Sequence, residues 1–364
     1  IVKIKNNMKV CILDNGITSL TLAKALVNQK IYVDIISNKN SPTMASRTIG
    51  ISRSNVEFFN SYILNIDKII WKLNKIEIFT DNLKNEKLID FEDNKNYLFS
   101  IVKNSDLYQL LKKDLVKNKY FKQINLNKNL IFDKKYNLII NTNYFSPIAK
   151  KYFHKKILKK YNSFAFTTTI KHEKILNKTA SQIFTQRGPL AFLPISNFET
   201  SVVYSLDNLK NIKDDHLYSL IKKYNLKYKI KGFDKIQSIE LISSSLRSYY
   251  HENILAFGDM LHKIHPLAGQ GFNMTIRDIK ILINIITKKI DLGLPINYLV
   301  NQEFESKCKS KNYIFSNGID YVYEFFNFER KTHSKLLSKS VKLLCDNSMI
   351  NKFFTRIADR GINY

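Results

Sequence analysis

The stretch KVCILDNGITSLTLAKALVNQKIYVDII, residues 9–36, carries the strongest structural signal in the chain. An apolar run at 9–14 is followed by the turn residue Gly16, by helix-like apolar spacing at 20–27 and by a second apolar run at 31–36. A strand, a helix and a parallel strand in such close succession form a βαβ unit, which opens dinucleotide-binding folds. We therefore predict an α/β protein that begins with a Rossmann-like domain.

The segments that follow predict both helices and strands. Amphipathic spacing predicts helices over 54–71 and 105–117, and alternating or apolar runs predict strands within 76–91 and at 137–140. Residues 164–207 are rich in β-branched and aromatic residues with turn signals between them. This composition indicates an antiparallel sheet distinct from the opening fold.

The last third of the chain is predicted to be mainly helical. The run ILAFGD at 254–259 indicates a strand that ends in a turn, and a helix is expected to begin near Gly271. The expected buried stripe of this helix consists of Phe272, Ile276, Ile279, Ile283, Ile286 and Ile290. From residue 297 onward the pattern predicts further helices of mixed polarity.

The chain is strongly basic. Its 364 residues include 58 Lys and Arg against 31 Asp and Glu, a formal net charge of +27. Such an excess is typical of proteins that bind nucleic acid or an anionic membrane. Only eight of the basic residues are Arg, however, and Lys is spread along the whole chain instead of forming the Arg clusters that grip phosphates. We interpret the charge as compositional and expect no nucleic-acid partner.

Composition also bounds the class of protein. Hydrophobic residues make up 44% of the chain, which excludes collagen-like and wholly disordered classes. Cys11, Cys308 and Cys345 form no CxxC pair, so we expect a reducing compartment without disulfides or a zinc site. No stretch reaches 18 uncharged apolar residues, and the opening residues lack the apolar core of a signal peptide. The expected location is cytoplasmic, with peripheral contact at the inner face of a membrane as an option.

The segment GDMLHKIHPLAGQGFNMTIRD, residues 258–278, carries the chemistry. Asp259 lies at the carboxyl edge of the expected strand, Pro266 fixes a turn, and Gly269 and Gly271 precede the long helix. Glycine at these places lets the backbone approach a ligand, and the helix start offers free N–H groups and the positive end of a dipole. A flat heteroaromatic ligand that develops negative charge suits this arrangement.

This segment resembles the flavin-contacting motif of the group A FAD-dependent aromatic hydroxylases, and specifically of the ubiquinone-biosynthesis hydroxylases. The order of other segments agrees with the family: RTIGISRSNVEFF at 47–59, YLFSIVKNSDLYQLL at 97–111 and GPLAFLPI at 188–195. The resemblance implies the p-hydroxybenzoate-hydroxylase type of α/β fold, in which a Rossmann-like FAD-binding domain carries an inserted antiparallel β-sheet and C-terminal helices.

The implied division of the chain is discontinuous. The FAD-binding domain would comprise 8–72, 97–163 and 250–292, the β-rich substrate domain 73–96 and 164–249, and the C-terminal helical segment 293–364.

The resemblance also implies an activity. The chain would be an FAD-dependent monooxygenase that hydroxylates the aromatic ring of a polyprenylated phenol in ubiquinone biosynthesis, using O2 and NAD(P)H as a transient reductant, through a C4a-hydroperoxyflavin. Its partners would be this lipophilic substrate and either a membrane surface or other ubiquinone-biosynthesis proteins. Residues 321–344 interleave aromatics with Lys331, Lys335, Lys339 and Lys342, so this segment is interpreted either as an interfacial helix or as a helix packed on the flavin domain.

The family pattern assigns roles to individual residues. Asp259 would hydrogen-bond the ribityl or pyrophosphate part of FAD, and Arg47 would lie near the flavin and its phosphates. The turn with Pro266, Leu267 and Gly271 would form the catalytic face against the isoalloxazine, with no acid or base assigned. The implied cofactor-binding residues are Gly16, Arg47, Asp259, Gly269, Gly271, Phe272 and Asn273, the last three through backbone N–H groups that stabilise negative charge at the flavin N1/C2=O edge.

Several of these residues have a plainer interpretation. Asp259 could cap the following turn, and Arg47 could be a surface residue. His262 and His265, with His251 nearby, could be read as metal ligands. An HxxH pair without a Cys or carboxylate partner at helical spacing is a weak signal, so no metal is expected.

The chain departs from the family pattern at the ADP half of the expected FAD site. The GxGxxG positions hold Asp14, Gly16 and Ser19, and the acidic residue expected at the end of the second strand is Ser37. Asp34 lies three residues early and is expected to point elsewhere. A carboxylate at position 14 would repel the pyrophosphate unless it turned away.

Two hypotheses follow from this pattern. The chain is either an active enzyme that binds FAD mainly through the flavin end, or a catalytically impaired member of the fold that serves as a partner or scaffold in a ubiquinone-biosynthesis complex. The intact segment 258–278 favours the active enzyme.

Overall fold

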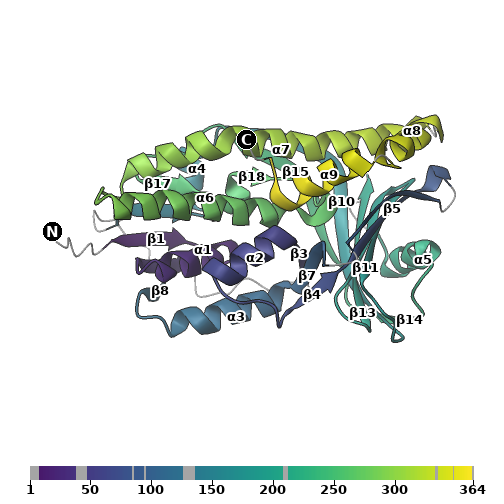
Figure 1. Ribbon diagram of the computed structural model, residues 1–364, viewed down its shortest axis with the longest axis horizontal. Helices are drawn as coiled ribbons and strands as arrows, with labels where there is room; N and C mark the ends of the chain where they lie inside the picture. Colours follow the sequence, from purple (N-terminus) through teal and green to yellow (C-terminus); the bar gives the residue numbers. More distant parts are fainter. Residues whose placement is uncertain are drawn as a thin grey trace.

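The computed structural model describes residues 8–37, 47–83, 86–93, 96–125, 136–207, 212–332, 335–346 and 348–362. Two large sheets lie next to each other along the molecule, and helix α7 (Tyr298–Thr332) runs beside both of them (Figure 1). Among the described helices, none is both long and apolar enough to cross a lipid bilayer.

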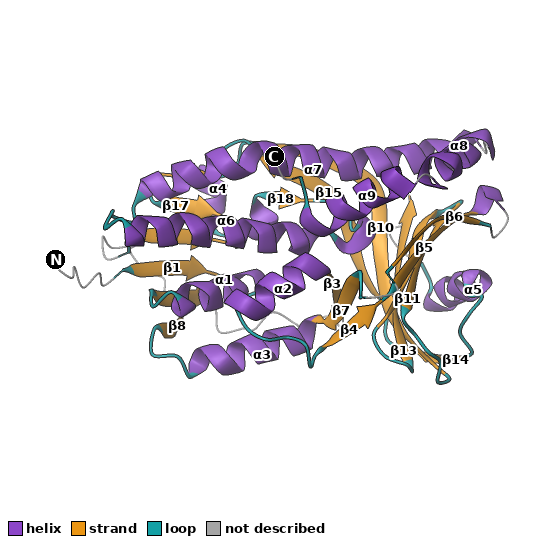
Figure 2. Cartoon of the chain, in the orientation of Figure 1, coloured by secondary structure: helices purple, strands orange, loops and turns teal. Residues whose placement is uncertain are grey.

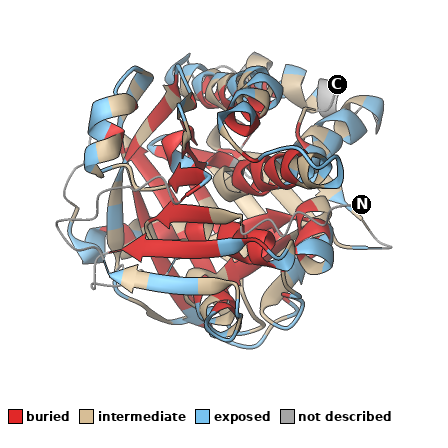
Figure 3. Ribbon diagram, turned by 90° about the vertical axis from the view of Figure 1, so that its left-hand side faces the viewer, coloured by how far each residue is buried: buried red, intermediate tan, exposed pale blue. Residues whose placement is uncertain are grey.

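The first sheet confirms the expected βαβ opening. Its strand order is β16-β17-β9-β1-β2-β8. The bounds are β1 (Lys9–Leu13), β2 (Tyr32–Ser37), β8 (Phe121–Asn125), β9 (Leu138–Asn141), β16 (Tyr250–His251) and β17 (Ile254–Ala256). Strand β1 pairs in parallel with β2 and β9, and helix α1 (Ile17–Asn28) connects β1 to β2. The inner strands are buried on both faces, as is usual for parallel strands covered by helices (Figure 3).

Helices pack over this sheet in a continuous layer. Helix α1 contacts α3 (Asn104–Val116) and α6 (Gly271–Asp291), and α6 in turn contacts α7. The predicted stripe on α6 is largely confirmed, because its four central isoleucines are buried. A short helix, α4 (Pro147–Tyr152), follows β9 and is capped by the side chain of Ser146.

The second sheet has nine strands and is mainly antiparallel, as the pattern at 164–207 predicted (Figure 2). Its strand order is β18-β15-β10-β13-β12-β11-β5-β6, and β14 pairs with β10. The bounds are β5 (Lys75–Thr80), β6 (Lys87–Glu92), β10 (Lys156–His172), β11 (Thr179–Thr185), β12 (Gly188–Pro194), β13 (Glu199–Asp207), β14 (Ile230–Phe233), β15 (Gln237–Leu246) and β18 (His262–Lys263). Helix α5 (Asp214–Tyr224) packs on this sheet through Leu217 and Ile221.

A smaller, three-stranded sheet has the strand order β3-β7-β4 and is separate from the two large sheets. It comprises β3 (Thr48–Ser52), β4 (Ile70–Leu73) and β7 (Phe99–Lys103), and helix α2 (Arg53–Tyr62) follows β3. The predicted helix over 54–71 is therefore wrong in its second half. Both Ile63 and Leu64 donate to the carbonyl of Phe59, and the Asn60 side chain accepts the N–H of Ile66, so the chain turns out of the helix and pairs with β7 as β4.

The helices predicted from residue 297 onward are confirmed as α7, α8 (Lys335–Asp346) and α9 (Ser348–Arg360). The segment 321–344 is divided between α7 and α8. On α7, Phe326 is buried and stacks on Phe184 of the second sheet with ring centroids 3.5 Å apart, whereas Tyr321 and Phe328 are exposed. One face of this segment is thus packed and the other faces solvent; the side chains of Lys335 and Cys345 lie outside the described residues.

Candidate functional site

Three segments that are distant in sequence meet beside the first sheet: the turn after β1, strand β3, and residues 258–273. Gly258 has φ +66°, and a Cβ added to it would lie 2.6 Å from Cγ2 of Thr18, so the 3-10 turn η2 (Gly258–Met260) presses against the first turn of α1. A Cβ added to Gly269 would lie 3.8 Å from Cα of Gly50 in β3. A side chain at position 258 would therefore clash with Thr18, whereas at position 269 a Cβ would make ordinary contact and glycine is favoured by its φ of +62°.

Asn273, in the first turn of α6, holds this meeting point together. Its Oδ1 accepts the N–H of Ser52 at 2.9 Å and a hydrogen bond from Asn55 Nδ2 at 2.8 Å. Its Nδ2 donates to the carbonyls of Gly50 at 3.1 Å and Gly269 at 3.2 Å. Because the side chain is fully buried, these four bonds fix α6 to β3, to α2 and to the preceding turn.

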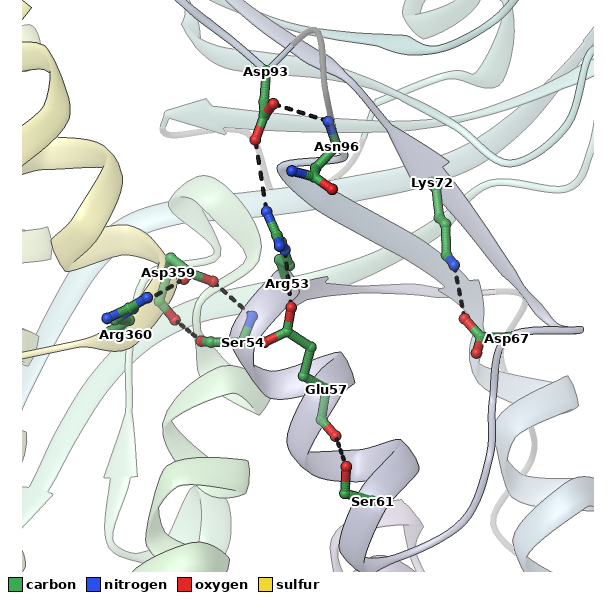
Figure 4. A network of polar contacts seen from close by, with 10 residues as sticks. All are labelled: Arg53, Ser54, Glu57, Ser61, Asp67, Lys72, Asp93, Asn96, Asp359 and Arg360. Carbon is green, nitrogen blue, oxygen red and sulfur yellow. Dashed lines mark hydrogen bonds and ion pairs between the residues drawn. The ribbon is translucent and has the colours of Figure 1, made fainter.

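Helix α9 closes the same corner from outside (Figure 4). Oδ1 of Asp359 accepts the N–H of Ser54 at 2.8 Å, and the Asp359 carbonyl accepts the hydroxyls of Ser52 and Ser54, each at 2.8 Å. A carboxylate at the start of a helix satisfies N–H groups that have no partner within the helix. The last helix thus caps α2 and ties the chain's C-terminal part to β3.

The turn before α6 has the shape that its sequence predicts. The 3-10 turn η3 (Leu267–Gly269) follows the exposed Pro266, and Gly269 has φ +62°. Among the described residues, no atom lies within 4 Å of a Cβ added to Gly271, and no side chain caps α6. Gly271 and Phe272 are in the first turn of α6, at the positive end of the helix dipole, where backbone N–H groups have no acceptor within the helix. The Leu267 side chain, in contrast, is buried between the second sheet and α7.

A buried aromatic cluster supports this turn from behind. The His265 ring stacks on Tyr323 with centroids 4.3 Å apart and meets Tyr161 edge-on at 5.0 Å. Its Nδ1 accepts the N–H of Leu267 at 3.2 Å. Burial, reinforced by the charge of Lys159, lowers the pKa of His265 to about 3. The imidazole is therefore neutral at physiological pH and acts as an acceptor that positions the turn.

The other histidines considered as metal ligands have separate partners. His262 Nε2 lies 2.6 Å from Oδ2 of Asp278, and Asn312 donates to the other oxygen of that carboxylate at 3.0 Å. The His251 ring stacks on Tyr152 with centroids 4.1 Å apart. Among the residues that the structure describes, no three potential metal ligands lie together.

Arg47 and Asp259 interact electrostatically but do not form an ion pair in the structure. Asp259 is exposed on η2, and Arg47 precedes β3. Partial burial lowers the pKa of Arg47, and the negative charge of Asp259 opposes this shift. The turn that carries Asp259 lies beside the start of α1, because η2 packs on Thr18.

Asp14 covers the N-terminus of α1. Its φ of +96° is in a region that favours glycine. Its Oδ2 would lie 3.3 Å from a Cβ added to Gly16, the N-cap of α1, so the carboxylate lies at this helix end. Burial raises the pKa of Asp14, although interaction of the carboxylate with the backbone N–H groups of Asn15 and Gly16 opposes the shift.

The other unusual residues of the glycine motif are accommodated within the protein. Ser19 is fully buried and donates to Oγ1 of Thr142 at 2.7 Å, since the Thr142 hydroxyl itself donates to the carbonyl of Leu13. Asp34 points elsewhere, as predicted: it accepts the hydroxyl of Tyr136 at 2.7 Å and pairs with Lys9 at 2.7 Å.

Comparison with known sequences finds several ubiquinone hydroxylases. The chain is 29% identical over 155 residues to 3-demethoxyubiquinol 3-hydroxylase of Escherichia coli, covering 40% of this chain and 39% of that protein. It is 27% identical over 186 residues to ubiquinone biosynthesis monooxygenase COQ6 of Dictyostelium discoideum, covering 41% and 38%. The matched parts thus span about two fifths of each relative's length. No family model matches the chain.

Comparison with solved structures covers nearly the whole chain. p-Nitrophenol 4-monooxygenase PnpA of Pseudomonas putida superposes with a TM-score of 0.76 at 12% identity, covering 97% of this chain and 99% of that one. HpxO of Klebsiella pneumoniae, solved with FAD and uric acid, gives 0.76 at 11% identity, covering 97% of each. The chain has the fold of the FAD-dependent monooxygenases. In sequence, two fifths to nearly half of the chain is similar to proteins named ubiquinone hydroxylases.

Within this monooxygenase fold, the structure also shows residues that the sequence pattern did not indicate. The Phe99 ring lies across Gly50, where an added Cβ would be 2.2 Å from Cε1, and reaches within 3.8 Å of a Cβ added to Gly269. It therefore borders the turn before α6. The side chain of Asn273 and the carboxylate of Asp359 are further examples, because their partners lie more than 200 residues away.

Proposed function

We propose that this chain is an FAD-dependent monooxygenase that hydroxylates the aromatic ring of a polyprenylated phenol in ubiquinone biosynthesis, with NAD(P)H and O2 as co-substrates. The observation that carries the proposal is the corner where β3, the turn η3 and the start of α6 are locked together by Asn273. The monooxygenase fold and relatives named ubiquinone hydroxylases support it.

The isoalloxazine end of FAD fits this corner. A Cβ added to Gly271 would meet no described atom within 4 Å, so there is room beside the start of α6 for a flat ring. The N–H groups of Gly271 and Phe272 would stabilise negative charge at one edge of that ring. His265 and Asn273 keep the turn in one conformation, so that these groups are oriented before the ligand binds.

Bound FAD would supply the redox chemistry, accepting a hydride from NAD(P)H and activating O2. The residues of the chain would then bind, orient and shield the reacting groups. Pro266 and Leu267 would line the turn beside the ring, with only Pro266 exposed toward solvent in this structure. Asp359 would shield the β3–α2 corner from water by holding α9 over it.

The pyrophosphate end of FAD does not fit in the same way. In dinucleotide-binding folds the phosphates lie at the N-terminus of the first helix. Here the carboxylate of Asp14 lies at that helix end, where it interacts with the N–H groups of Asn15 and Gly16. Arg47, which interacts electrostatically with Asp259, is the cation that we propose contacts a phosphate of FAD.

A lipophilic substrate favours peripheral contact with a membrane. Tyr321 and Phe328 on α7 and Leu343 on α8 are exposed apolar side chains, and Lys331 and Lys339 are exposed on the same two helices. Exposed apolar groups next to lysines favour binding to anionic headgroups. We propose this surface as the contact through which the enzyme reaches its substrate.

Complementation of a strain that lacks a ubiquinone hydroxylase tests the proposal. The wild-type chain is expected to restore ubiquinone synthesis, Asp259→Ala to abolish the rescue, and Asp291→Asn, at an exposed position at the end of α6, to retain it. Rescue that persists in Asp259→Ala would instead favour the scaffold function. Failure of the wild-type chain in every hydroxylase-deficient strain would contradict the proposed reaction.

A further inference from the structure

The start of α1 carries its own anion. The Asp14 carboxylate lies at the N-cap of this helix, with Oδ2 3.3 Å from the position of a Cβ added to Gly16, and it interacts with the backbone N–H groups of Asn15 and Gly16. These backbone groups and the helix dipole are what a ligand phosphate would otherwise use. The carboxylate therefore occupies the position of a ligand anion.

The backbone conformation of Asp14 is unfavourable for a residue with a side chain. Asp14 has φ +96°, which L side chains rarely adopt and which glycine adopts freely. Its own N–H donates to the carbonyl of Ile36 at 3.0 Å, so the turn is fixed between β1 and β2. A glycine would satisfy this turn without strain, and what the aspartate adds is the negative charge at the helix end.

Neighbouring groups on the ADP side are also directed into the protein. Ser19 donates to Thr142, and Asp34 is held by Tyr136 and Lys9. The hydroxyl of Ser37, at the end of β2, is buried without a hydrogen-bond partner among the described residues. No carboxylate at the end of β2 is therefore available for a ribose.

We propose that Asp14 is a built-in substitute for a ligand phosphate, and that the chain consequently selects flavins by their isoalloxazine end without engaging a pyrophosphate at α1. This inference rests on the proposed function. It names the ligand class more narrowly: a flavin whose affinity does not depend on its adenylate half. Riboflavin and FAD are then expected to bind with similar affinity.

Equilibrium titration of the full-length chain with riboflavin and with FAD, followed by quenching of flavin fluorescence, tests this inference. In the wild-type protein the two dissociation constants are expected to agree within about threefold. Asp14→Gly removes the carboxylate and suits the positive φ, so FAD is expected to bind about tenfold or more tightly while riboflavin is unchanged. Asp14→Asn keeps the size of the side chain and is expected to shift FAD affinity in the same direction, by less.

Two controls separate this effect from folding and from net charge. Circular dichroism verifies that each variant is folded, and Asp14→Asn carries the test if Asp14→Gly is not. Asp291→Asn changes the net charge as Asp14→Asn does, at an exposed and distant position, and is expected to leave FAD affinity unchanged.

The outcomes distinguish this inference from the proposed function. Wild-type protein that binds FAD tenfold or more tightly than riboflavin, with the same ratio in both Asp14 variants, overturns the role of Asp14 while FAD binding stands. Failure of every form to bind either flavin overturns the proposed function and this inference with it.

Discussion

Replacing Asn273 with alanine is expected to destabilise the corner that carries the proposed flavin site. The substitution removes four buried hydrogen bonds, to Ser52, Asn55, Gly50 and Gly269, and leaves backbone groups without partners. At about 1 kcal/mol net for each bond, the free energy of unfolding should fall by about 4 kcal/mol. This is a large effect for a single substitution, and we expect it because the substitution disrupts a buried network of hydrogen bonds.

Urea unfolding followed by the fluorescence of Trp71, the one tryptophan of the chain, measures the effect. The Trp71 indole donates to the carbonyl of Asn177 at 2.7 Å, so its emission reports on the junction between the small sheet and the second sheet. The control is Asn317→Ala, which removes one exposed bond to the Tyr313 carbonyl and should cost less than about 0.5 kcal/mol. A midpoint for Asn273→Ala equal to that of Asn317→Ala would refute the role given to this side chain.

Three further predictions concern the elements around this corner. Asp359→Ala removes the acceptor for the Ser54 N–H and should cost about 1 kcal/mol, seen as several-fold faster hydrogen exchange at the start of α2; unchanged exchange there would contradict the capping role. Burial lowers the pKa of His265 to about 3, so the unfolded chain takes up a proton at this residue before the folded protein does, and the free energy of unfolding should fall by about 2 kcal/mol between pH 7 and pH 5. His265→Gln should remove this part of the pH dependence of the urea midpoint, and an equal dependence in both proteins would count against a neutral buried imidazole. Tyr321→Ser combined with Phe328→Ser should reduce co-sedimentation with anionic vesicles relative to Tyr62→Ser, an exposed tyrosine at the end of α2, and equal binding would remove this surface from the account.

Periodicity predicted the elements whose burial follows a single face. The βαβ opening and the stripe on α6 were predictable, because apolar spacing directly reports which side of a strand or helix is buried. The same signal failed after Tyr62, where Ile66, Ile69 and Ile70 fit helical spacing but lie in a turn and a strand. There, pairing of β4 with β7 outweighed the local pattern.

The site was predictable in its backbone and not in its side-chain contacts. The glycines at 269 and 271 and the conflict at Asp14 could be read from residue types, because each concerns local conformation or charge. The hydrogen bonds of Asn273 could not, since its partners in β3 come from the other end of the chain. The direction of the Asp14 carboxylate likewise depends on the turn geometry that the structure supplies.

Titration of the purified chain with FAD, monitored by the visible flavin absorption spectrum after removal of unbound ligand, tests the central proposal most directly. We expect the wild-type protein to retain bound flavin with a perturbed spectrum, and Asn273→Ala to retain less of it. Protein that remains colourless at saturating FAD, while circular dichroism shows it to be folded, would contradict the proposed flavoenzyme.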